Sequence, residues 1–109
     1  MSKLRYVVLR HDGIENPHFD LLFESSPGSE LTGVRLDEWP TTAGTKLERI
    51  ADHRRIYLEY EGAVSGGRGQ VRRVAAGTCT VKTDEGNGLF LSLDTGLAIR
   101  LPAAQRGPG

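Results

Sequence analysis

The stretch Leu4-Arg-Tyr-Val-Val-Leu-Arg-His-Asp-Gly-Ile-Glu-Asn-Pro-His-Phe-Asp-Leu-Leu-Phe-Glu24 contains two segments with strand character. The first, Leu4–Arg10, is an apolar, valine-rich run, which is typical of a β-strand. The second, His18–Glu24, alternates with period two, which also indicates a strand. Between them, Asp12-Gly13 and Asn16-Pro17 are dipeptides that favour turns. The stretch therefore predicts two strands joined by a loop.

The alternation in His18–Glu24 gives the two faces of the second strand different characters. Successive side chains of a strand point to opposite faces. One face carries Phe19, Leu21 and Phe23 and is the natural core face. The opposite face, expected to line a cleft, a barrel interior or the solvent, carries His18, Asp20 and Leu22.

The rest of the chain contains short apolar segments separated by turns, and no convincing long helix. Fourteen glycines fall mainly between these segments, as is typical of tight turns. Asn87-Gly88 is a strong hairpin signal, and Gly62–Gly69 is expected to be a loop. The segments 46–51 and 56–60 fit either a strand or a short helix. Further strands are expected at 31–39, 71–75, 78–82, 89–93 and 97–101, with a break at Gly77.

These segments predict the fold class. Many short strands at regular spacing favour a small barrel or a sandwich, and a length of 109 residues suits one domain. We predict an all-β protein, or a mostly β protein with one short helix. The expected architecture is a small closed or partly open β-barrel formed by residues 1–109, with a disordered tail at 103–109.

Composition excludes several classes of function. The formal net charge is zero, so no global field attracts the protein to nucleic acid or to a membrane, although local basic patches remain. The single cysteine, Cys79, excludes an internal disulfide and a thiolate zinc cluster. No apolar run approaches the roughly 20 residues that span a bilayer, and the N-terminus lacks the apolar region of a signal peptide. We expect a soluble, cytoplasmic protein without a membrane partner.

Two of the three histidines stand close to Asp20 and form the first candidate site. His18 and Asp20 are two residues apart on one strand, so their side chains share a face. If the preceding loop folds back as a hairpin, His11 returns to within reach of His18. Imidazole and carboxylate groups suit Mn²⁺, Zn²⁺ or Fe²⁺, and they also suit acid–base chemistry on phosphate. The alternative is a set of polar residues on a solvated strand face.

The third histidine, His53, follows Asp52 and stands four residues before Tyr57. Taken alone, His53 fits a surface histidine in an arginine-rich loop, and Tyr57 fits a packing residue. The functional interpretation depends on whether these two side chains converge with the first cluster.

The joint order of several short motifs resembles the 3′-phosphoesterase domain at the N-terminus of bacterial DNA ligase D. The segment His18–Glu24 is similar to the family's His-Tyr-Asp-Phe-Arg-Leu-Glu motif. The segment Asp52–Tyr57 is similar to its Asp-His-Pro motif with a tyrosine four residues after the histidine. Tyr6–His11 resembles the strand that ends in the family's first metal histidine. Tyr60–Gly67 and Gly77-Thr78 resemble its Phe-Glu-Gly-Val-Ile-Pro-Glu-Gly segment and the Gly-Thr that follows.

This resemblance, which extends from about Arg5 to Leu101, implies a fold and an activity. The family fold is a small β-barrel with an active site on its concave side. The family removes 3′-terminal ribonucleotides and 3′-phosphates from primer strands during DNA repair. The implied partners are therefore nucleic-acid 3′ ends and a separate ligase or polymerase.

The resemblance also implies roles for individual residues. The metal ligands would be His11, His18 and Asp20, with Mn²⁺ as the first choice and Zn²⁺ or Co²⁺ as alternatives. His53 would contact the scissile phosphate or donate a proton, and Tyr57 would bind a phosphate oxygen. We also place Lys46 and Arg68 among the expected phosphate-binding residues.

The chain departs from the family pattern at several positions. Leu22 stands where the family has a phosphate-binding arginine, and leucine neither donates a hydrogen bond nor neutralises charge. Trp39-Pro40-Thr41 replaces a Val-Pro-Lys segment and lacks its lysine. Lys46 is one position out of register with the basic residue before the family's Asp-His motif. The first two histidines are one residue further apart than in the family, so their loop is expected to bulge.

Two functions follow from the sequence. The first is a metal-dependent phosphoesterase that acts on the 3′ ends of nucleic acid, with His53 as general acid or electrostatic stabiliser. The second is a catalytically lapsed relative that binds nucleic-acid ends or a protein partner, which Leu22 and the missing lysine favour.

Overall fold

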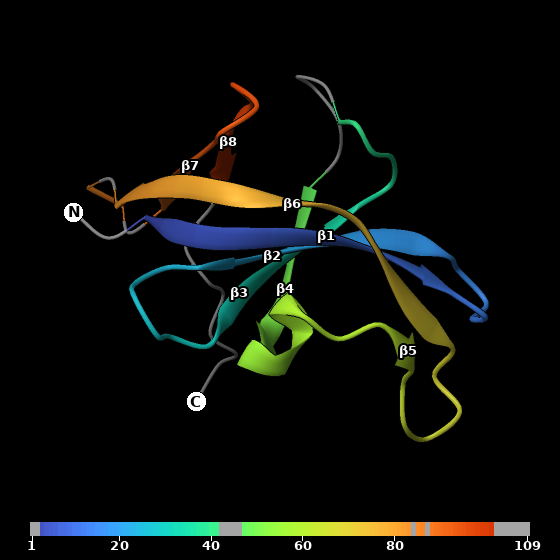
Figure 1. Cartoon of the computed structure of the whole chain (residues 1–109). Helices are drawn as coiled ribbons and strands as arrows, with labels where there is room; N and C mark the ends of the chain where they lie inside the picture. Colours follow the sequence, from blue (N-terminus) through green and yellow to red (C-terminus); the bar gives the residue numbers. More distant parts are fainter. Residues whose placement is uncertain (1–2, 42–46, 84, 87, 102–109) are drawn as a thin grey trace, which may run out of the picture.

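A computed structural model describes residues 3–41, 47–83, 85–86 and 88–101 (Figure 1). These residues form one antiparallel sheet of eight strands and a single-turn 3₁₀-helix, η1 (Arg55–Leu58). The strands are β1 (Leu4–Asp12), β2 (His18–Glu24), β3 (Leu31–Leu36), β4 (Leu47–His53), β5 (Gly62–Ala63), β6 (Gln70–Thr83), β7 (Leu89–Leu93) and β8 (Ala98–Leu101).

The sheet is strongly curled but not closed. Its strand order is β4-β3-β2-β1-β6-β7-β8, with β5 paired to β6. Side chains from β2 and β3 share one core cluster with side chains from β7 and β8, so the two arms of the sheet bend toward each other. No pairing joins the terminal strands β4 and β8 within the described ranges. The protein is therefore an all-β half-barrel with one short helix, which confirms the predicted partly open barrel.

The concave core face is mostly apolar, and its buried polar groups include the Tyr6 hydroxyl, the Thr32 hydroxyl and the Cys79 thiol. Burial raises the pKa of Cys79 to about 11, so this thiol is a packing group, as its position in a strand suggests. The core cluster comprises Tyr6, Val8, Leu21, Phe23, Val34, Leu36, Cys79, Leu91, Leu93, Ile99 and Leu101.

A second, smaller apolar cluster lies on the opposite face of the sheet, under η1. Because both faces of the sheet are covered here, Tyr6–Leu9 is buried on both sides. This is why the sequence of β1 is continuously apolar rather than alternating. The smaller cluster also explains why β2 buries residues of both alternating sets. The second cluster comprises Val7, Leu9, Leu22, Leu31, Leu58 and Val71.

The predicted break at Gly77 is wrong, because β6 runs without interruption from Gln70 to Thr83. Gly77 pairs with Tyr6 in the ladder. A Cβ at this position would collide with the Asp94 carboxylate, which accepts hydrogen bonds from the Tyr6 hydroxyl at 2.9 Å and the Thr78 N–H at 3.1 Å. Glycine at this position therefore allows the Asp94 carboxylate to approach the backbone closely, and it does not form a turn.

The irregular part of β6 lies further toward its N-terminal end. The register with β1 shifts between Val8 and Leu9, and Val74 is left without a ladder partner. Such a bulge bends a strand and increases its twist, and Figure 1 shows β6 bending over β1 toward β5. This bend brings the segment after β5 next to the outer half of β1.

The remaining sequence predictions divide into three groups. The strands expected near 31–39, 89–93 and 97–101 are present, and β6 and β7 pair as the hairpin signal predicted. The two ambiguous segments form β4 and η1. Lys46, Asn87 and the tail 103–109 lie outside the described residues. No helix in the described part of the chain has the length and apolarity to cross a membrane.

Candidate metal centre and active site

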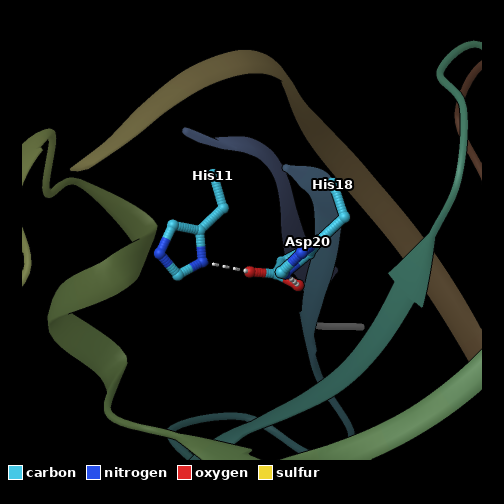
Figure 2. A group of neighbouring side chains, drawn as sticks. All are labelled: His11, His18 and Asp20. Atoms are coloured by element: carbon cyan, nitrogen blue, oxygen red, sulfur yellow. Dashed lines mark ion pairs between the residues drawn. The ribbon is translucent and has the colours of Figure 1, made fainter. Parts of the chain in front are cut away.

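His11 and His18 face each other across the hairpin of β1 and β2. Their Cα atoms are register partners, and their ring centroids lie 5.1 Å apart. Asp20 follows on β2, so its carboxylate emerges on the same face. Figure 2 shows the His11 ring facing this carboxylate, and Nε2 of His18 lies close to its other oxygen. One ligand atom from each side chain lies within 4.8 Å of the others, so the hairpin brings the predicted cluster together.

Backbone carbonyl groups determine which nitrogen of each imidazole carries a proton. Nδ1 of His18 donates to the Asn16 carbonyl at 2.8 Å, and Nε2 of His11 donates to the Arg68 carbonyl at 2.7 Å. Because a carbonyl oxygen only accepts, the opposite nitrogens of the neutral rings hold the lone pairs. Nε2 of His18 lies 3.1 Å from Asp20 Oδ1, and Nδ1 of His11 lies 3.6 Å from Asp20 Oδ2.

Two lone pairs and a carboxylate pointing at one another favour a bound cation. Asp20 is only 5% exposed, and its Oδ1 accepts no hydrogen bond from the residues that the structure describes. An unpaired buried carboxylate is costly, and a cation among the three groups offsets this cost. Metal-binding histidines usually donate their second ring N–H to a carbonyl or carboxylate, as both rings do here.

The three residues therefore fit a divalent metal ion. Nitrogen and oxygen ligands of this kind suit Mn²⁺, Zn²⁺ or Co²⁺. The alternative of a solvated polar face is wrong, because His18 and Asp20 are buried.

The cluster opens into a pocket that also contains His53 and Tyr57. The pocket volume is about 500 Å³, within the range of about 300–1,000 Å³ typical of small-molecule sites. His53 ends β4, and its Nδ1 donates to the Ala51 carbonyl at 2.8 Å, so the lone pair of the neutral ring lies on Nε2. The Tyr57 ring packs edge-to-face on His53 with centroids 5.7 Å apart. The structure therefore brings both predicted catalytic side chains to the same pocket as the candidate metal ligands His11 and Asp20.

An ion pair between the buried Glu24 and the half-exposed Arg55 holds η1, and with it Tyr57, against the sheet. Glu24 Oε2 accepts a hydrogen bond from the Arg55 guanidinium at 2.7 Å, and Glu24 also accepts from the N–H groups of Arg5 and Gly28. Burial opposes ionisation of Glu24, but these hydrogen bonds outweigh it and hold its pKa below the ordinary value. Sequence reasoning assigned no role to Glu24 or Arg55, although an acidic residue ending an otherwise buried strand is a signal for a specific partner.

One part of the pocket lining, next to the candidate metal ligands, is apolar. Beside the metal cluster, the floor consists of Leu9, Leu22 and Val71, and Leu22 is fully buried. The strand position that carries an arginine in the resembling family is thus occupied by an apolar floor residue.

Two arginines line the pocket. Arg68 was expected from the sequence, and its guanidinium hydrogen-bonds to Ser65 while its carbonyl holds His11. Arg54 was not expected, and the described residues provide its guanidinium with no ion pair. Both side chains are largely exposed, so they are available to an anionic ligand.

Comparison with protein-family models and with curated proteins finds no match for this chain.

Proposed function

We propose that this protein is a metal-dependent phosphoesterase that acts on 3′-phosphate or 3′-ribonucleotide ends of nucleic acid in DNA repair. The observation that carries the proposal is the convergence of two imidazole lone pairs and the unpartnered Asp20 oxygen in a pocket shared with His53 and Tyr57. A metal-binding group beside a free imidazole suits the transfer of phosphoryl groups to water. The motif order supports the choice of 3′ ends as substrate.

The chain's own groups divide the work. His11, His18 and Asp20 would hold the ion, Mn²⁺ as first choice, and a bound ion supplies Lewis-acid polarisation of the phosphoryl group. His53 Nε2 protonates the leaving oxygen or stabilises charge on phosphate. The described residues provide no hydrogen-bond partner for the Tyr57 hydroxyl, which is free to donate to a phosphate oxygen.

The side chains that can neutralise charge on the phosphate are arginines on the pocket wall, because the strand position of Leu22 carries no cation. Arg54 and Arg68 stand at the pocket wall, and an arginine fork suits a phosphate anion. Leu22 offers nothing to an anion. We therefore expect modest affinity for phosphate, with the metal ion and the two arginines providing most of it.

The proposal is tested with a primer that ends in a 3′-phosphate and a primer that ends in one ribonucleotide. We expect turnover of at least one primer to require Mn²⁺ and to be lost in His18→Ala and Asp20→Asn. Asp37→Asn is the matched control, because Asp37 lies in the exposed turn after β3. His53→Ala should lower turnover by about 100-fold or more while leaving Mn²⁺ affinity unchanged. Absence of Mn²⁺-dependent turnover at high protein concentration would refute the proposal.

A second function is favoured by one observation, the buried Leu22 floor. If this leucine has removed an essential phosphate contact, the protein is a lapsed relative that binds nucleic-acid ends or a protein partner. Leu22→Arg separates the two functions. An active enzyme turns over the primers as the native protein and gains rate or phosphate affinity in Leu22→Arg, whereas a relative that lapsed through Leu22 shows turnover only in the Leu22→Arg variant.

A further inference from the structure

A second groove adjoins the pocket, and its lining combines aromatic and aliphatic side chains with Arg54 and Ser65. Its volume is about 160 Å³, which is small for a whole ligand and suits one planar group. Arg54, Tyr57 and Val64 line both the pocket and the groove. The two hollows are therefore continuous around η1, with a cation where they meet.

A row of aromatic rings leads from the pocket into the groove. Tyr57 packs edge-to-face on His53 and also on Tyr60, with 5.8 Å between the two tyrosine centroids. The Tyr60 hydroxyl donates to the Ala63 carbonyl, which fixes the ring against β5. Gly62 has a φ of 138°, and a Cβ there would lie 3.2 Å from the Tyr60 hydroxyl, so glycine gives this ring its place.

Ile56 forms the exposed side of the groove. It is 58% exposed, an unusual position for a large aliphatic residue in a helical turn whose other side packs on the sheet. The described chain has two more large apolar residues on its surface, Val74 and Phe90, and neither lines the groove. An exposed apolar side chain beside fixed aromatic rings and the Arg54 guanidinium, which has no ion-pair partner among the described residues, is a surface for a flat, partly apolar group attached to an anion.

We propose that this groove, Ile56 with Tyr57 and Tyr60, binds a nucleobase of single-stranded nucleic acid whose neighbouring phosphate lies at Arg54. This inference rests on the proposed function for its choice of ligand, because the groove continues directly from the candidate phosphate site. Base stacking on such platforms tolerates any base identity, so the groove recognises a strand end rather than a sequence. It would also give a protein with zero net charge an affinity that does not depend on phosphate contacts alone.

The test uses the full chain in EDTA, so that no hydrolysis occurs and metal binding plays no part. Two fluorescein-labelled hexathymidylates with a 3′-phosphate are compared by fluorescence anisotropy: one intact, and one with abasic residues at its last two positions. We expect the intact probe to bind about 5-fold more tightly or better. Ile56→Ala should remove most of this difference and leave binding of the abasic probe unchanged.

Phe90→Ala is the matched control, because it truncates an exposed apolar side chain that does not line the groove, and both affinities should stay at the native level. Equal binding of the two probes, absence of binding of either, or equal effects of Ile56→Ala and Phe90→Ala would overturn the inference.

Hydrolysis of bis(p-nitrophenyl) phosphate with Mn²⁺ reports on the pocket alone. If the native protein does not hydrolyse this substrate but binds the intact probe more tightly than the abasic probe, the proposed phosphoesterase activity is refuted and base binding in the groove is supported. If the native protein hydrolyses this substrate but binds both probes equally, base binding in the groove is refuted and the proposed phosphoesterase activity is supported.

Discussion

The two faces of the central β1–β2 hairpin are both buried, yet they are built differently. The core face packs apolar side chains from both arms of the curled sheet. The opposite face has a smaller apolar cluster and, beside it, the buried groups His18, Asp20 and Glu24. Neighbouring residues on β2 therefore serve different ends: one set supplies stability, while the other accepts unfavourable burial of polar groups to form a site.

The largest effect is expected on the core face. Phe23 is fully buried, so Phe23→Ala should cost about 4 kcal/mol of unfolding free energy through lost burial and a closed cavity. Leu22→Ala, one residue away, should cost only about 2 kcal/mol, because its space opens into the pocket. Urea unfolding measures both values. Equal losses of unfolding free energy in the two variants would contradict the distinction between a closed core at Phe23 and a pocket-lining position at Leu22.

A second, smaller loss is expected at Glu24, which ties η1 to the site face. Glu24→Gln should cost about 2 kcal/mol near neutral pH, because a charge-assisted hydrogen bond to Arg55 is lost. It should also reduce turnover more than Mn²⁺ affinity, since η1 positions Tyr57.

The pH dependence of this cost follows from the lowered pKa of Glu24. The stabilisation is complete above the ordinary glutamate pKa and disappears as the pH falls through the lower folded-state value. The native protein and Glu24→Gln should therefore converge in stability under acid conditions. A difference that persists unchanged at low pH would argue against an ionised Glu24.

At the edge of the core face, the Tyr6 hydroxyl donates a hydrogen bond to Asp94. Tyr6→Phe should lower the melting temperature by about 4 °C at neutral pH, as expected for one hydrogen bond in a small domain. Burial, with the Asp94 hydrogen bond and charge, raises the pKa of Tyr6 to about 12. Because the unfolded state ionises first, native stability should fall between about pH 10 and pH 12. Tyr6→Phe should lack this part of the alkaline loss in thermal melts.

The smallest expected change has the opposite sign. Without metal, Asp20→Asn should raise the unfolding free energy by about 0.5 kcal/mol, because the amide can donate to the His18 lone pair and no anion is buried. Asp37→Asn should be neutral in the same thermal melts. A clear destabilisation by Asp20→Asn in EDTA would mean that the carboxylate already has a favourable partner.

The sequence predicted most of the fold because its strands alternate or lie between turn residues. The closed or partly open barrel followed from many short strands at regular spacing, and the face shared by His18, Asp20 and Leu22 followed from the alternation in β2. Gly77 misled the prediction, because a glycine that makes room for a distant carboxylate looks the same in sequence as one that makes a turn. The contact with Asp94 is visible only after β7 and β8 have folded back.

The sequence predicted the candidate metal ligands, but not the groups that orient them or the elements that surround them. The two histidines and Asp20 stand close in sequence, so the hairpin alone brings them together. The carbonyl of Arg68, which orients His11, comes from a segment 57 residues away. The groove at Ile56 likewise depends on how η1 sits on the sheet, and a four-residue turn has no periodicity from which to infer that placement.

The central claim is that His11, His18 and Asp20 form a divalent metal site, and calorimetric titration of Mn²⁺ into the protein tests it most directly. We expect one ion per chain, a stabilisation of about 2.7 kcal/mol at 100 times the Kd, and affinity reduced about 100-fold or more in His18→Ala. Asp37→Asn should bind as the native protein does. The absence of saturable binding, or native-like affinity in His18→Ala, would contradict a metal site formed by these three residues.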